Sequence, residues 1–149
     1  MNASSEKWDE RFLRLAEHIS TWSKDPSTAV GSCIVRPDKT IASLGFNGLP
    51  RHVIDSADRL HDRDVKLKII LHSELNSILN AKEPLDGFTI YVWPFHPCSA
   101  CAAAIIQSGI TRVVAPVSDN PRWVTSFGLA ATMFGEAKVK VDLVDIPIV

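Results

Sequence analysis

The sequence has little that would suggest export, a membrane or a nucleic-acid partner. No apolar run approaches the roughly 20 residues that a membrane-spanning helix needs, and the N-terminal MNASSEKWDERF lacks the apolar stretch of a signal peptide. The net charge is only −1, so the chain has no overall basic excess for nucleic acid. Its three cysteines are an odd number, which fits a reducing compartment. We therefore expect a cytoplasmic protein without a membrane partner, in which cysteine serves a metal or catalysis.

Apolar residues are spaced as in a protein that alternates strands and helices. Trp8, Phe12, Leu15 and Ile19 recur at steps of three and four, which is typical of one face of a helix. Further expected elements are strands at 29–35, 40–46, 89–93, 112–117 and 139–143, and helices that begin near Ser73, Ser99 and Pro121. Residues 51–68 are charged, and we expect only part of them to be helical. This order predicts an α/β fold with a mixed sheet and helices on both faces.

Two short motifs carry potential metal ligands. They are His72-Ser73-Glu74 and Pro97-Cys98-Ser99-Ala100-Cys101. Cys98 and Cys101 are three residues apart, so both can bind one ion from the first turn of a helix. His72 and Glu74 would diverge in the middle of a helix, and they converge only if His72 lies at the non-helical edge of a helix start. The motifs therefore predict two helix starts that face one site.

The donor set of these motifs suits zinc. One imidazole and two thiolates are ligands that Zn²⁺ prefers, and three protein ligands leave a fourth position for water, as in catalytic zinc sites. Zinc lowers the pKa of that water to about 7, and Glu74 can carry the proton. Alone, Cys-x-x-Cys would also fit a zinc ribbon or a redox pair, and His-x-Glu a chance pair on a solvated helix. Together and in this order, they match the signature of zinc nucleobase deaminases.

Five segments, two of which contain the metal motifs, make this match more specific. The chain resembles the cytidine and deoxycytidylate deaminase superfamily, and within it the deoxycytidylate branch. The segments that carry the resemblance are Asp25-Pro-Ser-Thr-Ala-Val-Gly31, Gly45-Phe-Asn-Gly-Leu-Pro50, His72-Ser-Glu-Leu-Asn-Ser-Ile78, Pro97-Cys-Ser-Ala-Cys101 and Ile106-Gln-Ser-Gly-Ile110. One departure is Ser73, because the family usually has alanine between the histidine and the glutamate.

The resemblance implies a fold and a reaction. The fold would be a three-layer α-β-α arrangement whose five-stranded mixed sheet has an antiparallel first hairpin, with residues 1–149 forming a single domain. The reaction would be hydrolysis of dCMP to dUMP and ammonia, by attack of zinc-bound hydroxide on C4. His72, Cys98 and Cys101 would bind one zinc ion per subunit, and Glu74 would shuttle the proton.

Further residues are candidates for holding the substrate. By resemblance, Asn47 would bind substrate, although an asparagine here could also be a turn residue with unusual dihedral angles. Lys24, Ser27 and Thr28 could contact a phosphate, because hydroxyls, a lysine and loop N–H groups suit a monoester dianion; ordinary turn chemistry explains Ser27 and Thr28 equally well. A Ser73 hydroxyl that enters the pocket would affect base selectivity.

The expected partners are a small nucleotide substrate, dCTP or dTTP as effectors near Gly45–Pro50, and further copies of the chain in a dimer or hexamer. Two alternatives remain open. A nucleic-acid-editing deaminase of the tRNA adenosine deaminase type would share the site but need a positive channel. A non-enzymatic zinc module would need a fourth protein ligand, for which Cys33 or His96 is the nearby chemistry. The aromatic residues Trp93, Phe95 and Trp123 could stack on a base or pack in the core.

Overall fold

The protein is described here by a computed structural model, which describes residues 3–118 and 124–146. Its elements follow the order that the sequence predicts, with two additional short helices between the second strand and the first metal motif. The elements are α1 (Ala3–Ser20), β1 (Gly31–Val35), β2 (Ile41–Phe46), α2 (Ala57–His61), α3 (Arg63–Ile69), α4 (Ser73–Asn80), β3 (Thr89–Trp93), α5 (Ser99–Ser108), β4 (Arg112–Pro116), α6 (Val124–Glu136) and β5 (Lys140–Val144).

The strands form one mixed sheet in the order β2-β1-β3-β4-β5. Strand β1 is antiparallel to both of its neighbours, β2 and β3, so the first hairpin is antiparallel as predicted. The pairs β3–β4 and β4–β5 are parallel, and the helices α5 and α6 make their crossover connections. Four strands therefore point the same way and β1 alone runs against them.

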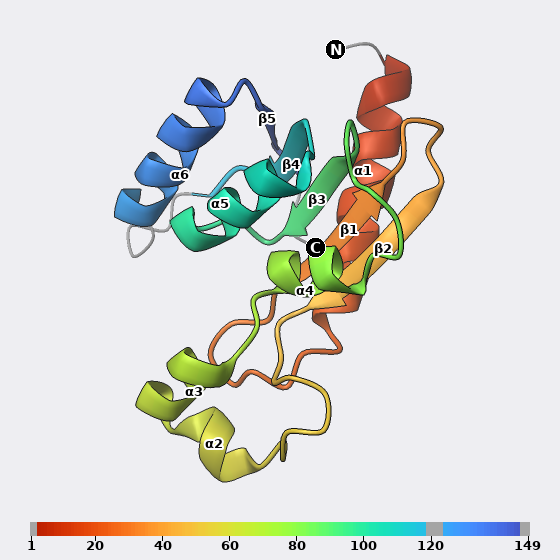
Figure 1. The fold of residues 1–149 in the computed structure, drawn as a ribbon. Helices are drawn as coiled ribbons and strands as arrows, with labels where there is room; N and C mark the ends of the chain where they lie inside the picture. Colours follow the sequence, from red (N-terminus) through yellow and green to blue (C-terminus); the bar gives the residue numbers. More distant parts are fainter. Residues whose placement is uncertain (1–2, 119–123, 147–149) are drawn as a thin grey trace.

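Helices cover both faces of the sheet, which gives three layers (Figure 1). On one face α1 packs its apolar stripe, including Phe12 and Leu13, against Cys33, Tyr91 and Val114 of the strands. On the other face lie α4, α5 and α6, and the core there includes these buried residues: Ile34, Ile90, Ala102, Ile105, Val113, Ala130 and Phe134. The three-layer prediction is confirmed.

The face with α1 also holds a buried charged cluster. Arg112 of β4 donates to both carboxylate oxygens of Asp9, at 2.9 and 2.7 Å, and to Asp142 of β5 at 2.8 Å. The Tyr91 hydroxyl donates to Asp9 at 2.7 Å. These bonds link α1 to three strands on the side of the sheet away from α4 and α5.

Residues 51–68, which we expect to be helical only in part, contain α2 and most of α3. Each helix begins with a capping side chain, because Ser56 accepts from the N–H of Arg59, and Asp62 from that of Val65. In Figure 1 the two helices project beyond the end of the sheet, next to the start of α4. The expected helix start at Pro121 and the aromatic candidate Trp123 lie outside the described residues.

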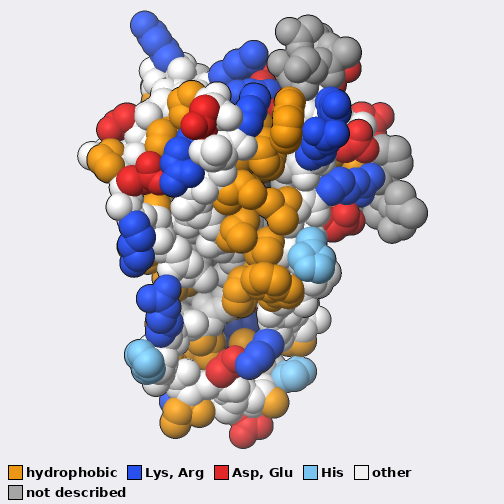
Figure 2. Space-filling model, turned by 90° about the vertical axis from the view of Figure 1, so that its right-hand side faces the viewer, with side chains coloured by type: hydrophobic (Ala, Val, Ile, Leu, Met, Phe, Trp, Pro, Cys, Tyr) orange, Lys and Arg blue, Asp and Glu red, His pale blue; other side chains and the backbone are white. Residues whose placement is uncertain are grey.

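The surface on the side of α1 and β2 carries a run of apolar side chains bordered by charged ones (Figure 2). Exposed large apolar residues of this part of the chain include Trp22, just after α1, and Ile41 of β2. Contiguous apolar patches of this kind often mark contact surfaces, and the dimer or hexamer stays a prediction.

Within residues 3–118 and 124–146, every helix is too short or too polar to cross a bilayer.

Candidate functional site

The two metal motifs lie at the starts of neighbouring helices. His72 is the N-cap of α4 and Cys98 is the N-cap of α5, and both have extended backbone conformations. Neither side chain makes the usual capping hydrogen bond to its own helix. Both side chains are therefore available to a shared site, which is the arrangement that the sequence predicts.

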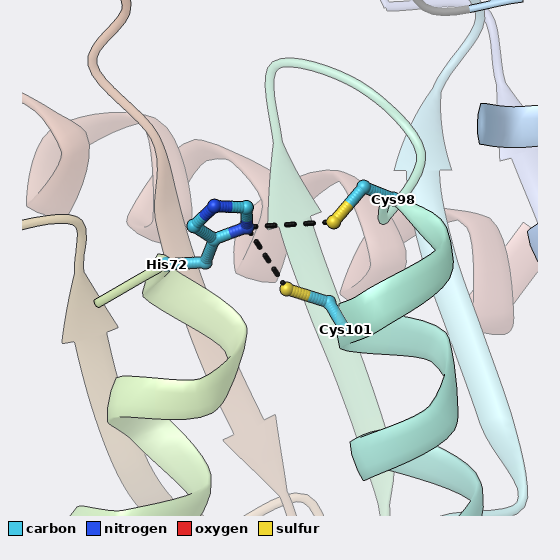
Figure 3. A group of neighbouring side chains, drawn as sticks. All are labelled: His72, Cys98 and Cys101. Carbon is cyan, nitrogen blue, oxygen red and sulfur yellow. Dashed lines mark hydrogen bonds between the residues drawn. The ribbon is translucent and has the colours of Figure 1, made fainter. Parts of the chain in front are cut away.

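Three side chains from these helix starts form one compact group. The Nδ1 atom of His72 lies 3.2 Å from the sulfur of Cys101 and 3.4 Å from that of Cys98 (Figure 3). All three donor atoms lie within 4.8 Å of one another, and no other group of metal donors is found in the described part of the chain. Zinc bonds of about 2.1 Å to nitrogen and 2.3 Å to sulfur would place tetrahedral ligands about 3.6 Å apart. The three residues fit a zinc ion in both chemistry and spacing.

The electrostatics of the group favour a thiolate. The hydrogen bond from Cys101, together with that from His72, lowers the pKa of the Cys98 thiol to about 4 against the opposing effect of burial. The same pairing with Cys98 and burial raise the pKa of Cys101. The hydrogen bond to Cys98 raises the pKa of His72. Because N–H groups at helix starts stabilise negative charge, the site is prepared for a cation between these ligands.

A close, polar interface holds α4 against β1 and β2. The Ser32 hydroxyl contacts the Ser73 carbonyl at 2.8 Å and the Ser77 hydroxyl at 3.0 Å, and Ser43 donates to the Ser77 carbonyl at 2.7 Å. At Gly45 a Cβ atom would lie 2.5 Å from the backbone of both Ser73 and Ser77. The absence of a side chain at this position therefore allows α4 to approach the sheet and fixes the height of its first turn.

The residue before His72 is held in place separately. Gly48 and Leu71 exchange two backbone hydrogen bonds, of 3.1 and 2.8 Å. This bridge joins the glycine-rich segment after β2 to the entry of α4, and so fixes the direction from which His72 reaches the cysteines.

Glu74 lies one residue inside α4 and is nearly buried, with 4% of its surface exposed. Burial raises the pKa of its carboxyl group, partly offset by a hydrogen bond from the Ser73 hydroxyl. That hydroxyl donates to Oε1 of Glu74 at 2.6 Å. A buried carboxyl group with a raised pKa beside a metal site is suited to accept and release a proton.

A cavity of about 100 Å³ adjoins the ligand group. Its walls include both His72 and Cys98, and also Glu74. Four of the five predicted substrate-binding residues line it, namely Asn47, Ser73, Ser27 and Thr28.

The fifth predicted residue, Lys24, is not among the residues that line the cavity. Its ammonium group instead pairs with Asp55 at 2.7 Å, on the exposed surface. The structure therefore does not bring Lys24 together with the other candidates.

The side-chain amide of Asn47 is hydrogen-bonded to the loop before β1. Its oxygen accepts from the Val30 N–H at 2.9 Å, and its nitrogen donates to the Thr28 carbonyl at 2.8 Å and to Asp25 at 3.2 Å. These bonds shape the cavity wall, and direct substrate binding by Asn47 stays a prediction.

Two basic residues of α3 also line the cavity, and neither was predicted as a site residue from the sequence. The ammonium group of Lys66 is buried against Asp25, at 3.0 Å, and Ser27, at 2.7 Å. Burial raises the pKa of Asp25, but hydrogen bonds from Ser27, Lys66 and Thr28 outweigh this effect and leave it lowered. Arg63 is exposed, and no other residue of the described chain pairs with its guanidinium. Their charged, aperiodic surroundings gave no signal that α3 would form a pocket wall.

Aromatic residues form another part of the cavity wall. Phe95 and Phe127 both line it, with ring centroids 5.6 Å apart, whereas Trp93 is buried in the core on the side of α1. Phe127 belongs to α6, which is attached to the start of α5 by a hydrogen bond of 3.0 Å between the Ser99 N–H and Ser126.

The two proposed fourth ligands lie apart from the metal group. Cys33 is in the core on the side of α1, where burial raises the pKa of its thiol to about 12. His96 packs between Phe127 and Phe134, with Nδ1 bonded to the Pro97 carbonyl at 2.8 Å. Neither belongs to the group of donors found among the described residues.

Comparison with known sequences identifies the family. Residues 6–117 match the family described as the cytidine and deoxycytidylate deaminase zinc-binding region. The chain is 45% identical over 138 residues to an uncharacterized deaminase in the luxG 3′ region of Aliivibrio fischeri, an alignment that covers 91% of this chain and 92% of that one. It is 41% identical over 111 residues to a probable deoxycytidylate deaminase of Caenorhabditis elegans, covering 72% of this chain and 56% of the relative. The chain thus spans little more than half the length of the nematode protein.

Comparison with solved structures identifies the fold. The dCMP deaminase of the cyanophage S-TIM5, solved in complex with dCMP and dUMP, matches with a TM-score of 0.74. The match covers 97% of this chain and 99% of the phage chain at 20% sequence identity. At this identity the likeness concerns the five-stranded α/β fold.

Proposed function

The chain belongs to the cytidine and deoxycytidylate deaminase family, and we propose that it hydrolyses dCMP to dUMP and ammonia. The observation that carries this proposal is the convergence of His72, Cys98 and Cys101 in one group of donors, next to a cavity that Glu74 also lines. In this reaction a C4–O bond to water forms and the C4–N4 bond of cytosine breaks. One water molecule is consumed for each ammonia released.

The roles of the residues follow from their positions. His72, Cys98 and Cys101 would hold zinc, which supplies a Lewis acid that activates water at neutral pH. Glu74 would accept a proton from the attacking water and deliver it to the departing amino group. Because the carboxyl group is nearly buried and has a raised pKa, it can hold that proton between the two steps.

The phosphate end of the substrate is assigned to the mouth of the cavity. Arg63 lines the same cavity as Ser27 and Thr28, and its guanidinium has no partner among the residues that the structure describes. A guanidinium binds phosphate through two parallel hydrogen bonds. Lys66 is already neutralised by Asp25, so we assign the phosphate to Arg63 with the two hydroxyls. Contacts to the phosphate at this position would make the protein prefer a nucleotide over a nucleoside as substrate.

The aromatic wall suits the base. A flat ring stacks favourably on aromatic side chains, and Phe95 and Phe127 provide this surface within the same cavity. A cytosine in contact with them would have its edge near the group formed by His72 and the cysteines.

Substrate turnover tests the proposal directly. The purified, zinc-loaded protein is incubated with dCMP, dCTP, deoxycytidine and cytosine, and ammonia release is followed. We expect the highest kcat/KM for dCMP, and elemental analysis should give about one zinc per chain. Activity confined to deoxycytidine or cytosine would reject the nucleotide assignment, and no turnover of any of the four would reject the deaminase proposal.

Metal analysis of two cysteine variants tests the ligand assignment. Cys101→Ser removes one proposed ligand, whereas Cys33→Ala removes a thiol that lies in the core on the side of α1. We expect zinc content to fall in the first and stay at about one per chain in the second. Equal zinc content in both variants would contradict the assignment.

A further inference from the structure

Ser73 lies between the proposed metal ligand His72 and the proposed proton carrier Glu74. Its side chain is fully buried, and its hydroxyl donates to Oε1 of Glu74 at 2.6 Å. Hydrogen bonds from hydroxyl to carboxylate at this distance are among the stronger ones in proteins. We propose that Ser73 is a positioning residue, which holds one carboxylate oxygen of Glu74 and thereby leaves the other to face the reacting atoms. This inference rests on the proposed function.

The backbone of Ser73 has little freedom to move. Its carbonyl accepts a hydrogen bond of 2.8 Å from Ser32, and the same carbonyl lies against Gly45, where even a Cβ atom would approach to 2.5 Å. The hydroxyl therefore has a fixed origin at the first turn of α4. A donor on a fixed backbone can set the rotation of a neighbouring carboxylate, whereas a donor on a mobile loop would follow it.

Ser73 becomes more important when the site holds a metal. The Cys101 side chain also lies within hydrogen-bonding reach of Glu74. A cysteine that ligates zinc is a thiolate and has no proton to donate. Ser73 is then the one side-chain donor to the Glu74 carboxylate within the described ranges.

The nearby hydroxyl of Ser77 provides a matched control. Ser77 is also buried in α4, and it contacts Ser32 at 3.0 Å and donates to the backbone carbonyl of Glu74 at 2.9 Å. Its removal costs a buried hydrogen bond on the same helix without touching the carboxylate. A loss of activity that comes only from loosening α4 would thus occur in both Ser73→Ala and Ser77→Ala.

The kinetic experiment compares the zinc-loaded wild type with Ser73→Ala, Ser73→Thr and Ser77→Ala. For Ser73→Ala we expect kcat on dCMP to fall by about tenfold or more while KM changes by less than about twofold, with unchanged zinc content. Ser73→Thr keeps the hydroxyl and should recover most of kcat. Ser77→Ala should unfold at a lower temperature but keep its kcat. An unchanged kcat in Ser73→Ala, or an equal fall in Ser77→Ala, would overturn the inference.

A double-mutant cycle of thermal stability tests the contact between Ser73 and Glu74 without measuring turnover. Thermal unfolding midpoints are measured for the zinc-loaded wild type, Ser73→Ala, Glu74→Ala and the double variant. Coupled residues give non-additive changes, so Ser73→Ala should lower the midpoint less when Glu74 is already alanine. Equal decreases in both backgrounds would contradict the contact. If the wild type does not deaminate dCMP, the proposed function fails, whereas the cycle still decides whether Ser73 and Glu74 are coupled.

Discussion

His72 and Cys98 occupy the same position in two different helices. Each is the N-cap residue, with φ near −70° and an extended ψ, and each directs its side chain away from its own helix to the other. The N-terminal ends of α4 and α5 therefore meet at one point. Because N–H groups at helix starts carry partial positive charge, this point stabilises thiolates.

Replacing the Glu74 carboxyl group should separate metal binding from turnover. In Glu74→Gln we expect zinc content to stay at about one per chain, while kcat on dCMP falls by about 10²- to 10⁴-fold because the proton carrier is lost. Glu83→Gln is the control, since Glu83 pairs with Arg36 at the surface. Ammonia release and elemental analysis are the measurements. Near-normal turnover in Glu74→Gln would exclude this residue as the proton carrier.

Two basic residues allow a test of phosphate recognition. Arg63→Gln should raise KM for dCMP by about tenfold or more, the effect of losing one charge-assisted contact, and should leave kcat/KM for deoxycytidine unchanged. Lys24→Gln should change neither, because Lys24 is paired with Asp55 away from the cavity lining. If Lys24→Gln instead has the larger effect on dCMP, the phosphate lies on the other side of the loop before β1.

The buried pair of Asp25 and Lys66 should contribute stability that depends on pH. The pKa of Asp25 is below its ordinary value of 3.8, so its stabilising effect is full above that value and is lost as pH falls through the lower, folded-state pKa. Lys66 provides the facing positive charge, at 3.0 Å. We expect Asp25→Asn to lower the free energy of unfolding by about 3 kcal/mol at pH 7.

The measurement for this pair is urea unfolding of Asp25→Asn and the wild type from pH 7 down to pH 2. The difference in unfolding free energy should narrow as the pH falls below 3.8. A difference that stays constant over this range would show that Asp25 acts through packing alone.

Two glycine positions should respond to alanine in opposite directions. Gly45→Ala would push a methyl group into the backbone of Ser73 and Ser77, so α4 must move away from the sheet. Overpacking of this kind costs about 1–3 kcal/mol, and we expect weaker zinc binding as well, since α4 carries His72. Gly128→Ala has open space and should stabilise α6 by up to about 1 kcal/mol. Zinc titration and thermal unfolding distinguish the two, and a Gly45→Ala variant with unchanged zinc affinity would disprove this role of the close contact.

The metal group could be predicted because its geometry is local. The positions of Cys98 and Cys101 within one helical turn follow from their spacing, and the edge position of His72 follows from its distance to Glu74 along the chain. The strands were predictable for a similar reason, since each has its own run of β-branched or alternating residues.

The wall formed by α3 could not be predicted because it depends on contacts between distant residues. The bond from Lys66 to Asp25 joins positions 41 residues apart, and nothing in the charged segment indicates that partner. Lys24 shows the opposite case, because its nearness in sequence to Ser27 suggested a shared role, whereas the structure does not place it in the cavity wall. In the structure the lysine side chain turns to Asp55 instead.

The bridge between Gly48 and Leu71 closes the base of the excursion that contains α2 and α3. Both ends of this excursion are tied to each other before the chain enters α4. Between Arg51, which bonds to Asn80 of α4, and Asp55, which bonds to Lys24, residues 52–54 are exposed. A change of length there falls on the outer side of the bridge and should not displace His72. An insertion or an attached tag in that stretch should leave the positions of the metal ligands unchanged. The stretch is therefore a suitable site for inserting a foreign sequence.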